Sequence, residues 1–134
     1  MSSNETRAVV IERELPYSPK RIWRALTQSH LIQEWLMKTE FEPVLGHRFD
    51  LEAAWGSVHC EVKVVEPHER LSYSWDTKDL RSVITWTLTP TDSGTRLRME
   101  QTGFRPDQEA YYRGASAQWP NCFAAIEQIV ARMD

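Results

Sequence analysis

Residues 81–104, which read RSVITWTLTPTDSGTRLRMEQTGF, contain the pattern that decides the fold. Apolar and polar side chains alternate on both sides of a short central segment, and the apolar positions are Ile84, Trp86, Leu88, Leu97 and Met99. Alternation with a period of two is typical of a β-strand with one buried face. Because only the turn-prone residues 90–94 separate the two halves, we expect an antiparallel hairpin, since parallel pairing needs a much longer connection.

The same alternation extends from this hairpin back toward the N-terminus. Three further strands are predicted, with inward positions at Phe49, Leu51 and Ala53, at Val58, Cys60, Val62 and Val64, and at Leu71, Tyr73 and Trp75. The turn-prone segments 54–56, 66–69 and 76–81 separate them. Residues 7–15 predict one more strand, in which Val9, Ile11 and Leu15 share a face with Arg13. We therefore expect six strands, all antiparallel.

Helical patterns lie between the first two strands and at the C-terminal end. Ser18 before Pro19 and Ser29 before an apolar stripe predict two short helices. Residues 107–133 predict a long amphipathic helix, with apolar residues at spacings of three and four. Gly114 and Pro120 weaken this helix, so we expect a kink or a fresh start near Trp119. Residues 107–118 are then predicted to open as a lid.

Composition restricts the class of protein. The 134 residues fit a single domain over 1–134, and the 41% hydrophobic and 26% charged content is that of a soluble globular chain. A net charge of −3 argues against nucleic acid as a partner. No apolar run approaches the ~20 residues that span a bilayer, and no signal peptide is visible, so a cytoplasmic location is expected. Two free, buried cysteines, Cys60 and Cys122, are predicted, and a regulatory disulfide is the alternative.

Four segments carry a resemblance to a known family. They are PKRIWRALT (19–27) followed by QEWL (33–36), VLGHRF (44–49), RLSYSW (70–75), and TWTLTP (85–90) leading to GTRL (94–97). In this order the chain resembles the activator-of-heat-shock-protein-ATPase-like branch of the START superfamily. The resemblance implies an α+β helix-grip fold, as in birch pollen allergens, in which a curved antiparallel sheet surrounds a long C-terminal helix. It also implies a cavity of the kind that other superfamily members use for lipids, sterols, polyketides and plant hormones.

Motifs for catalysis or cofactor binding are not found in the sequence. The histidines at positions 30, 47, 59 and 68 lack the short spacings of metal ligands. No serine lies in a nucleophile elbow, and the glycines form no phosphate-binding cluster. We therefore predict no catalytic residue, no metal and no cofactor. An enzyme of the polyketide cyclase or hydrolase type, acting through acid–base groups in the cavity, remains the alternative.

The expected function is to bind a small apolar or amphipathic molecule between the sheet and the last helix. Strand parity and helix spacing direct ten candidate ligand-binding residues inward: Arg13, Trp35, Phe49, Tyr73, Trp75, Trp86, Met99, Gln101, Trp119 and Phe123. We expect the largest cavity to contact at least three of the eight that are neither Arg13 nor Gln101. Core packing is the alternative role for the aromatic residues, and a salt bridge at the strand edge is the alternative for Arg13.

The aromatic content favours a flat, apolar or aromatic ligand as the partner. A co-chaperone-like interaction with a chaperone or another protein, in a stress response, is the other alternative, which the resemblance suggests. A monomer or a weak homodimer is expected.

Overall fold

The computed structural model describes residues 6–133 and contains one antiparallel sheet of seven strands in the order β1-β7-β6-β5-β4-β3-β2. The strands are β1 (Arg7–Leu15), β2 (Lys38–Thr39), β3 (Arg48–Ala53), β4 (Gly56–Glu66), β5 (Arg70–Asp76), β6 (Arg81–Thr91) and β7 (Gly94–Phe104). The α+β class and the antiparallel pairing are confirmed. The predicted count of six strands is wrong by one, because β2 has only two residues and is too short to show alternation.

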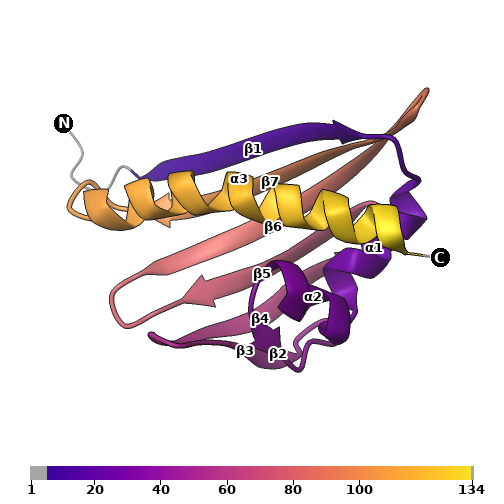
Figure 1. Ribbon diagram of the computed structural model, residues 1–134. Coiled ribbons are helices and arrows are strands. Elements are labelled where there is room, and N and C mark those ends of the chain that lie inside the picture. The colour runs from indigo at the N-terminus through magenta and orange to yellow at the C-terminus, as the bar shows by residue number, and fades with distance from the viewer. Residues whose placement is uncertain (1–5, 134) are drawn as a thin grey trace.

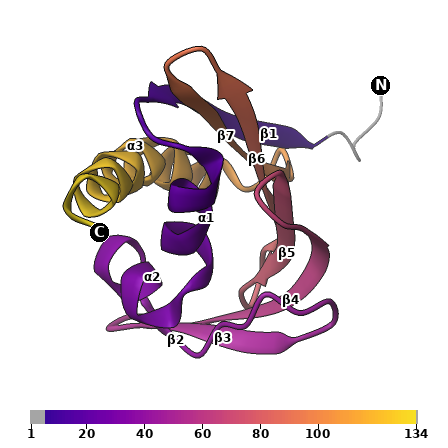
Figure 2. The ribbon, with the colours of Figure 1, turned by 90° about the vertical axis from the view of Figure 1, so that its right-hand side faces the viewer.

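Three helices lie within the curve of the sheet (Figures 1 and 2). They are α1 (Pro19–Thr27), α2 (Ser29–Trp35) and α3 (Glu109–Arg132). Figure 1 shows α3 running lengthwise along the sheet, and Figure 2 shows α1 and α2 between α3 and the strands β2 and β3. The sheet thus grips its helices, as the helix-grip fold requires.

The ends of the short helices follow local capping chemistry. Ser18 caps α1 by accepting a hydrogen bond from the Arg21 backbone N–H at 3.2 Å, and Pro19 lies in the first turn. The predicted cap of α2 is wrong, because Gln28 is its N-cap residue and makes no side-chain cap bond. The hydroxyl of Ser29 instead donates to the Phe41 carbonyl at 3.0 Å, which holds the following loop against the helix.

The alternation of buried and exposed residues follows the predicted inner face along most strands. A bulge between Val62 and Val64 in β4 adds one residue, so Val65 rather than Val64 packs toward the core. The β6–β7 turn packs tightly against the end of β1. A Cβ atom on Gly94 would lie 2.1 Å from the Leu15 carbonyl oxygen, so only glycine fits at this position.

Arg13 departs from the expected inward orientation. Its side chain is exposed and its guanidinium donates to the Glu12 carbonyl at 3.4 Å. Because β1 is an edge strand, a long side chain on its inner face can extend past the edge of the sheet into water. The alternation of the strand therefore predicts the correct face of the sheet for Arg13, but its side chain is exposed and not buried as expected.

The last helix is continuous, so a fresh start at Trp119 is not observed even though Pro120 lies inside it. Its buried residues are Trp119, Cys122, Phe123, Ile126, Ile129 and Val130, all in the C-terminal part. This end is also tied to α1, since the Arg21 Nε donates to the Val130 carbonyl at 2.9 Å. Within residues 6–133, none of the helices combines the length and the apolar character that crossing a membrane demands.

Candidate functional site

A cavity of about 780 Å³ lies beside the N-terminal half of α3. Its other walls are the turn between β3 and β4, the loop between β5 and β6, and the residues after α2. Figure 1 shows the start of α3 and the β5–β6 loop at the same end of the molecule, away from α1. The cavity is lined by Leu36, Met37, Ala53, Trp55, Gly56, Ser57, Trp75, Thr77, Lys78, Leu80, Gln101, Phe104, Ala110, Tyr111, Gly114, Ala115, Gln118, Trp119 and Cys122.

Large apolar side chains dominate this lining. Trp75 and Trp119 are in contact as a tilted pair, with ring centroids 5.7 Å apart and an interplanar angle of 58°. Trp55 adds a third indole from the β3–β4 turn and is 66% exposed. Aromatic walls of this kind offer a flat guest broad contact surfaces.

A buried chain of hydrogen bonds fixes the inner wall. The Trp119 indole N–H donates to Gln101 Oε1 at 2.8 Å, and Gln101 Nε2 donates to Ser82 Oγ at 3.1 Å. The Ser82 hydroxyl in turn donates to the Trp75 carbonyl at 2.7 Å. Gln101 thereby joins the two tryptophans across β5, β6, β7 and α3, and both ends of its amide are already engaged within the protein.

The ten predicted ligand-binding residues separate into three groups. Trp75, Gln101 and Trp119 line the cavity, whereas Arg13 is exposed on the edge strand. The other six are core residues outside the cavity lining, namely Trp35, Phe49, Tyr73, Trp86, Met99 and Phe123. The expectation that the cavity would contact at least three of the eight apolar and aromatic candidates is therefore wrong, because it contacts two.

The reason is that other elements cover much of the inner face of the sheet. Trp35 of α2 packs against Trp86 at 5.5 Å, and Phe41 packs against Phe49 at 4.9 Å. The indole N–H of Trp86 donates to the Tyr73 hydroxyl at 3.0 Å. The helices α1 and α2 and the chain after them thus fill one end of the curved sheet, and the cavity remains at the other end.

Several lining residues were absent from the sequence-based candidates. Trp55 and Lys78 lie in turns, and Tyr111 lies on the exposed side of the first turn of α3. Trp55 was the one lining residue that the sequence could have indicated. A large apolar side chain in a tight turn cannot belong to the buried face of a strand, so it points to another role. The positions of Lys78 and Tyr111 depend on how the loop meets the helix, which no local pattern encodes.

The buried titratable groups are held in their neutral forms. Burial raises the pKa of the Cys122 thiol, which lines the cavity, to about 11. Desolvation likewise raises the pKa values of the Cys60 thiol and the Tyr73 hydroxyl, both outside the cavity lining. Because a raised pKa keeps a thiol or phenol protonated at neutral pH, none of the three is an activated nucleophile. Among residues 6–133, no cluster of His, Cys, Asp and Glu side chains has the arrangement of a metal site.

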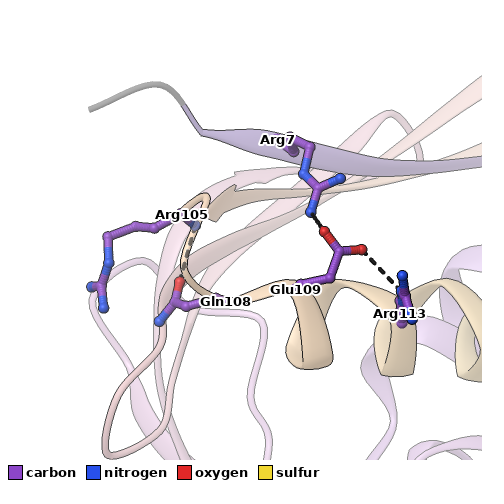
Figure 3. A network of polar contacts seen from close by, with 5 residues as sticks. All are labelled: Arg7, Arg105, Gln108, Glu109 and Arg113. Carbon is purple, nitrogen blue, oxygen red and sulfur yellow. Dashed lines mark hydrogen bonds and ion pairs between the residues drawn. The ribbon is translucent and has the colours of Figure 1, made fainter. Parts of the chain in front are cut away.

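The beginning of α3 is attached to β1 by charged groups (Figure 3). The Arg7 guanidinium pairs with Glu109, as Figure 3 shows. The Arg7 Cζ also lies 4.0 Å from the centroid of the Tyr112 ring. Glu109 also accepts a hydrogen bond from Arg113 Nε at 3.1 Å. The hydrogen bond from Arg7 is the main cause of the lowered pKa of the Glu109 carboxyl, and these exposed contacts are screened by water and salt.

Gln108 attaches the same end of the helix to the rest of the fold. Its Oε1 accepts from the Arg105 backbone N–H at 3.0 Å (Figure 3). Its Nε2 donates to the Asp79 carbonyl at 2.6 Å. The Tyr111 hydroxyl reaches the Asp79 carboxylate at 3.4 Å. Gln108 and Tyr111 therefore connect the start of α3 to the β5–β6 loop beside the cavity through polar contacts.

We predict faster amide exchange in residues 110–118 of α3 than in residues 121–132. No residue between Glu109 and Gln118 is buried, and Pro120 cannot donate a hydrogen bond to the Ser116 carbonyl. Exchange about tenfold faster is expected in the first half, with slowing there when an apolar guest binds. Hydrogen exchange followed by NMR measures both. Uniform protection along α3, unchanged by a bound guest, would contradict a lid.

Comparison with protein families gives a match over residues 16–131, to the model described as Activator of Hsp90 ATPase homolog 1-like protein. The structure of protein MLL2253 from Mesorhizobium loti is 54% identical, with a TM-score of 0.93, and the match covers 96% of this chain and 99% of that one. Comparison with curated proteins gives no significant match.

More distant structures share the fold alone. Protein BH1534 from Bacillus halodurans is 22% identical, with a TM-score of 0.83 over 92% of this chain and 96% of that one. CalU16 from Micromonospora echinospora is 19% identical, with a TM-score of 0.81 over 93% of this chain and 74% of that one.

Proposed function

The chain belongs to the family of activator of Hsp90 ATPase homolog 1-like proteins, and we propose that it binds a small apolar or amphipathic molecule without transforming it. The site of binding is the cavity between the N-terminal half of α3, the β3–β4 turn and the β5–β6 loop.

The cavity is the observation that supports this proposal. Its volume of about 780 Å³ falls within the range of roughly 300–1,000 Å³ that is typical of small-molecule sites. Trp55, Trp75 and Trp119 give it large apolar surfaces, and Thr77 and Gln118 add uncharged polar groups to its lining. A few polar groups in a mainly apolar concavity are the usual composition of a ligand site.

Binding without catalysis is favoured by the chemistry of the lining. Its titratable side chains are Lys78, Tyr111 and Cys122, and the Cys122 thiol is kept protonated by burial. General acid–base catalysis needs a group whose pKa is brought near the working pH and which lies within reach of the reacting atoms. Among residues 6–133, no carboxylate or imidazole lines the cavity to supply one. An enzyme of the cyclase or hydrolase type is thus the less supported function.

Protein interaction is a second candidate because of one surface feature. Val44 and Leu45, in the segment before β3, are 58% and 68% exposed. Two adjacent exposed aliphatic residues form a small apolar patch that a partner such as a chaperone could cover. The patch lies outside the cavity lining, so the two functions are separable by mutation.

Native mass spectrometry of the protein isolated from its own cells tests the proposed function. We expect a population whose mass exceeds that of the chain by a few hundred daltons, the mass of a small molecule that fills the cavity, as an order-of-magnitude estimate. The neutral fluorophore N-phenyl-1-naphthylamine, added to the unliganded protein, should bind and fluoresce. A chain that always has its bare mass and never binds the fluorophore would refute a ligand-binding function.

A further inference from the structure

We propose that the ligand is an amphipathic anion, with an apolar body among the tryptophans and a carboxylate, sulfonate or similar acidic group at Lys78. This inference rests on the proposed function and specifies its ligand class. It is drawn from the distribution of charge around the cavity.

Within the part of the chain that the structure describes, Lys78 is the single lining residue with a formally charged side chain. It is exposed in the β5–β6 loop and lines both the large cavity and the smaller adjoining one. Among residues 6–133 its ammonium group has no ion-pair or hydrogen-bond partner. An unpaired cation at the mouth of an apolar cavity attracts a guest with an acidic end and repels one with a basic end.

The charged residues next to Lys78 in the sequence do not line the large cavity. The Asp79 carboxylate is directed to the Tyr111 hydroxyl at 3.4 Å and does not line the cavity. Arg81 turns back into its own loop, where its guanidinium donates to the Thr77 carbonyl at 2.6 Å. Asp76 lines only the smaller cavity. Among residues 6–133, Lys78 is therefore the one formally charged residue in the lining of the large cavity, and the lining contains no acidic residue.

The inner wall of the cavity also favours a guest whose apolar part points inward. Gln101 engages both ends of its amide with Trp119 and Ser82, so a polar guest would meet few free partners at that depth. The apolar part of the guest is expected to go inward between Trp75 and Trp119. Its acidic end then stays at the rim, near Lys78 and water, where the cost of desolvating a charge is small.

Two fluorophores with the same body test the inference. N-phenyl-1-naphthylamine is neutral, and 8-anilinonaphthalene-1-sulfonate is the same skeleton with an acidic group. In low salt, Lys78→Gln should weaken binding of the sulfonate about fivefold, the scale of one exposed ion pair, and leave binding of the neutral fluorophore unchanged. Added salt at about 0.5 M should remove most of this difference.

Lys20→Gln is the matched control, because Lys20 is an exposed lysine on α1 that does not line the cavity. It should leave the affinity for both fluorophores unchanged. If Lys78→Gln leaves sulfonate binding unchanged, or weakens binding of both fluorophores equally, the inference is wrong while the binding function stands. If neither fluorophore binds the unmodified protein, the proposed function itself fails.

Discussion

Gly114→Phe is expected to weaken binding of N-phenyl-1-naphthylamine by tenfold or more while leaving the protein folded. Gly114 lines the cavity from α3, and beyond its chain neighbours and the nearby backbone of its own helix, no described atom lies within 4 Å of where its Cβ would be. A helical side chain points back toward the preceding turn, which here contains the lining residues Ala110 and Tyr111. A phenyl ring would therefore take the place of guest surface, and about 60 Å² of lost apolar contact corresponds to tenfold.

Two other variants on α3 separate occlusion from damage. Gly114→Ala should bind the fluorophore normally and unfold at higher denaturant, because alanine in a helix interior is about 1 kcal/mol more favourable than glycine. Ala117→Phe adds the same ring at an exposed position outside the cavity lining and should also bind normally. Fluorescence titration of all three compares them directly. Normal binding by Gly114→Phe would place the guest elsewhere.

Trp86→Ala is expected to lower the free energy of unfolding by about 3–5 kcal/mol, the usual cost of truncating a buried aromatic residue. Trp86 is fully buried and lies against Trp35, Trp119 and Phe123. Its indole N–H also bonds the Tyr73 hydroxyl, which the substitution leaves buried without that donor. Urea denaturation followed by circular dichroism measures the change.

Trp55→Ala is the control for this stability effect. Trp55 is 66% exposed at the cavity rim, so its loss should change the free energy of unfolding by less than about 0.5 kcal/mol. It should instead weaken binding of the apolar fluorophore. Equal destabilisation by the two substitutions would contradict the division into core and cavity tryptophans. Should Trp86→Ala fail to fold, Trp86→Phe gives the same comparison at a smaller cost.

Sequence patterns were sufficient for most of the fold because sheet and helix periodicity are local properties. The alternation around Trp86 and Met99 gave the β6–β7 hairpin, and Ser18 before Pro19 gave the start of α1. The patterns failed where pairing depends on distant segments. The two-residue β2 exists because Lys38 and Thr39 pair with Glu52 and Leu51 of β3, a pairing that two residues cannot encode as a pattern.

The site was less predictable for a related reason. Strand parity identified the inner face correctly for Trp75, Gln101 and Trp86, yet only the first two line the cavity. Which part of that face stays open is decided by α2, whose Trp35 covers Trp86. Rim residues such as Trp55 come from turns, where periodicity gives no information.

The indole N–H signals of the six tryptophans provide the most direct test of the cavity as the binding site. Trp55, Trp75 and Trp119 line it, whereas Trp23 and Trp35 are buried elsewhere. In a ¹⁵N–¹H spectrum, added N-phenyl-1-naphthylamine should shift the three lining signals and leave those of Trp23 and Trp35 in place. Binding that shifts the Trp23 and Trp35 signals while the three lining signals stay fixed would contradict the account.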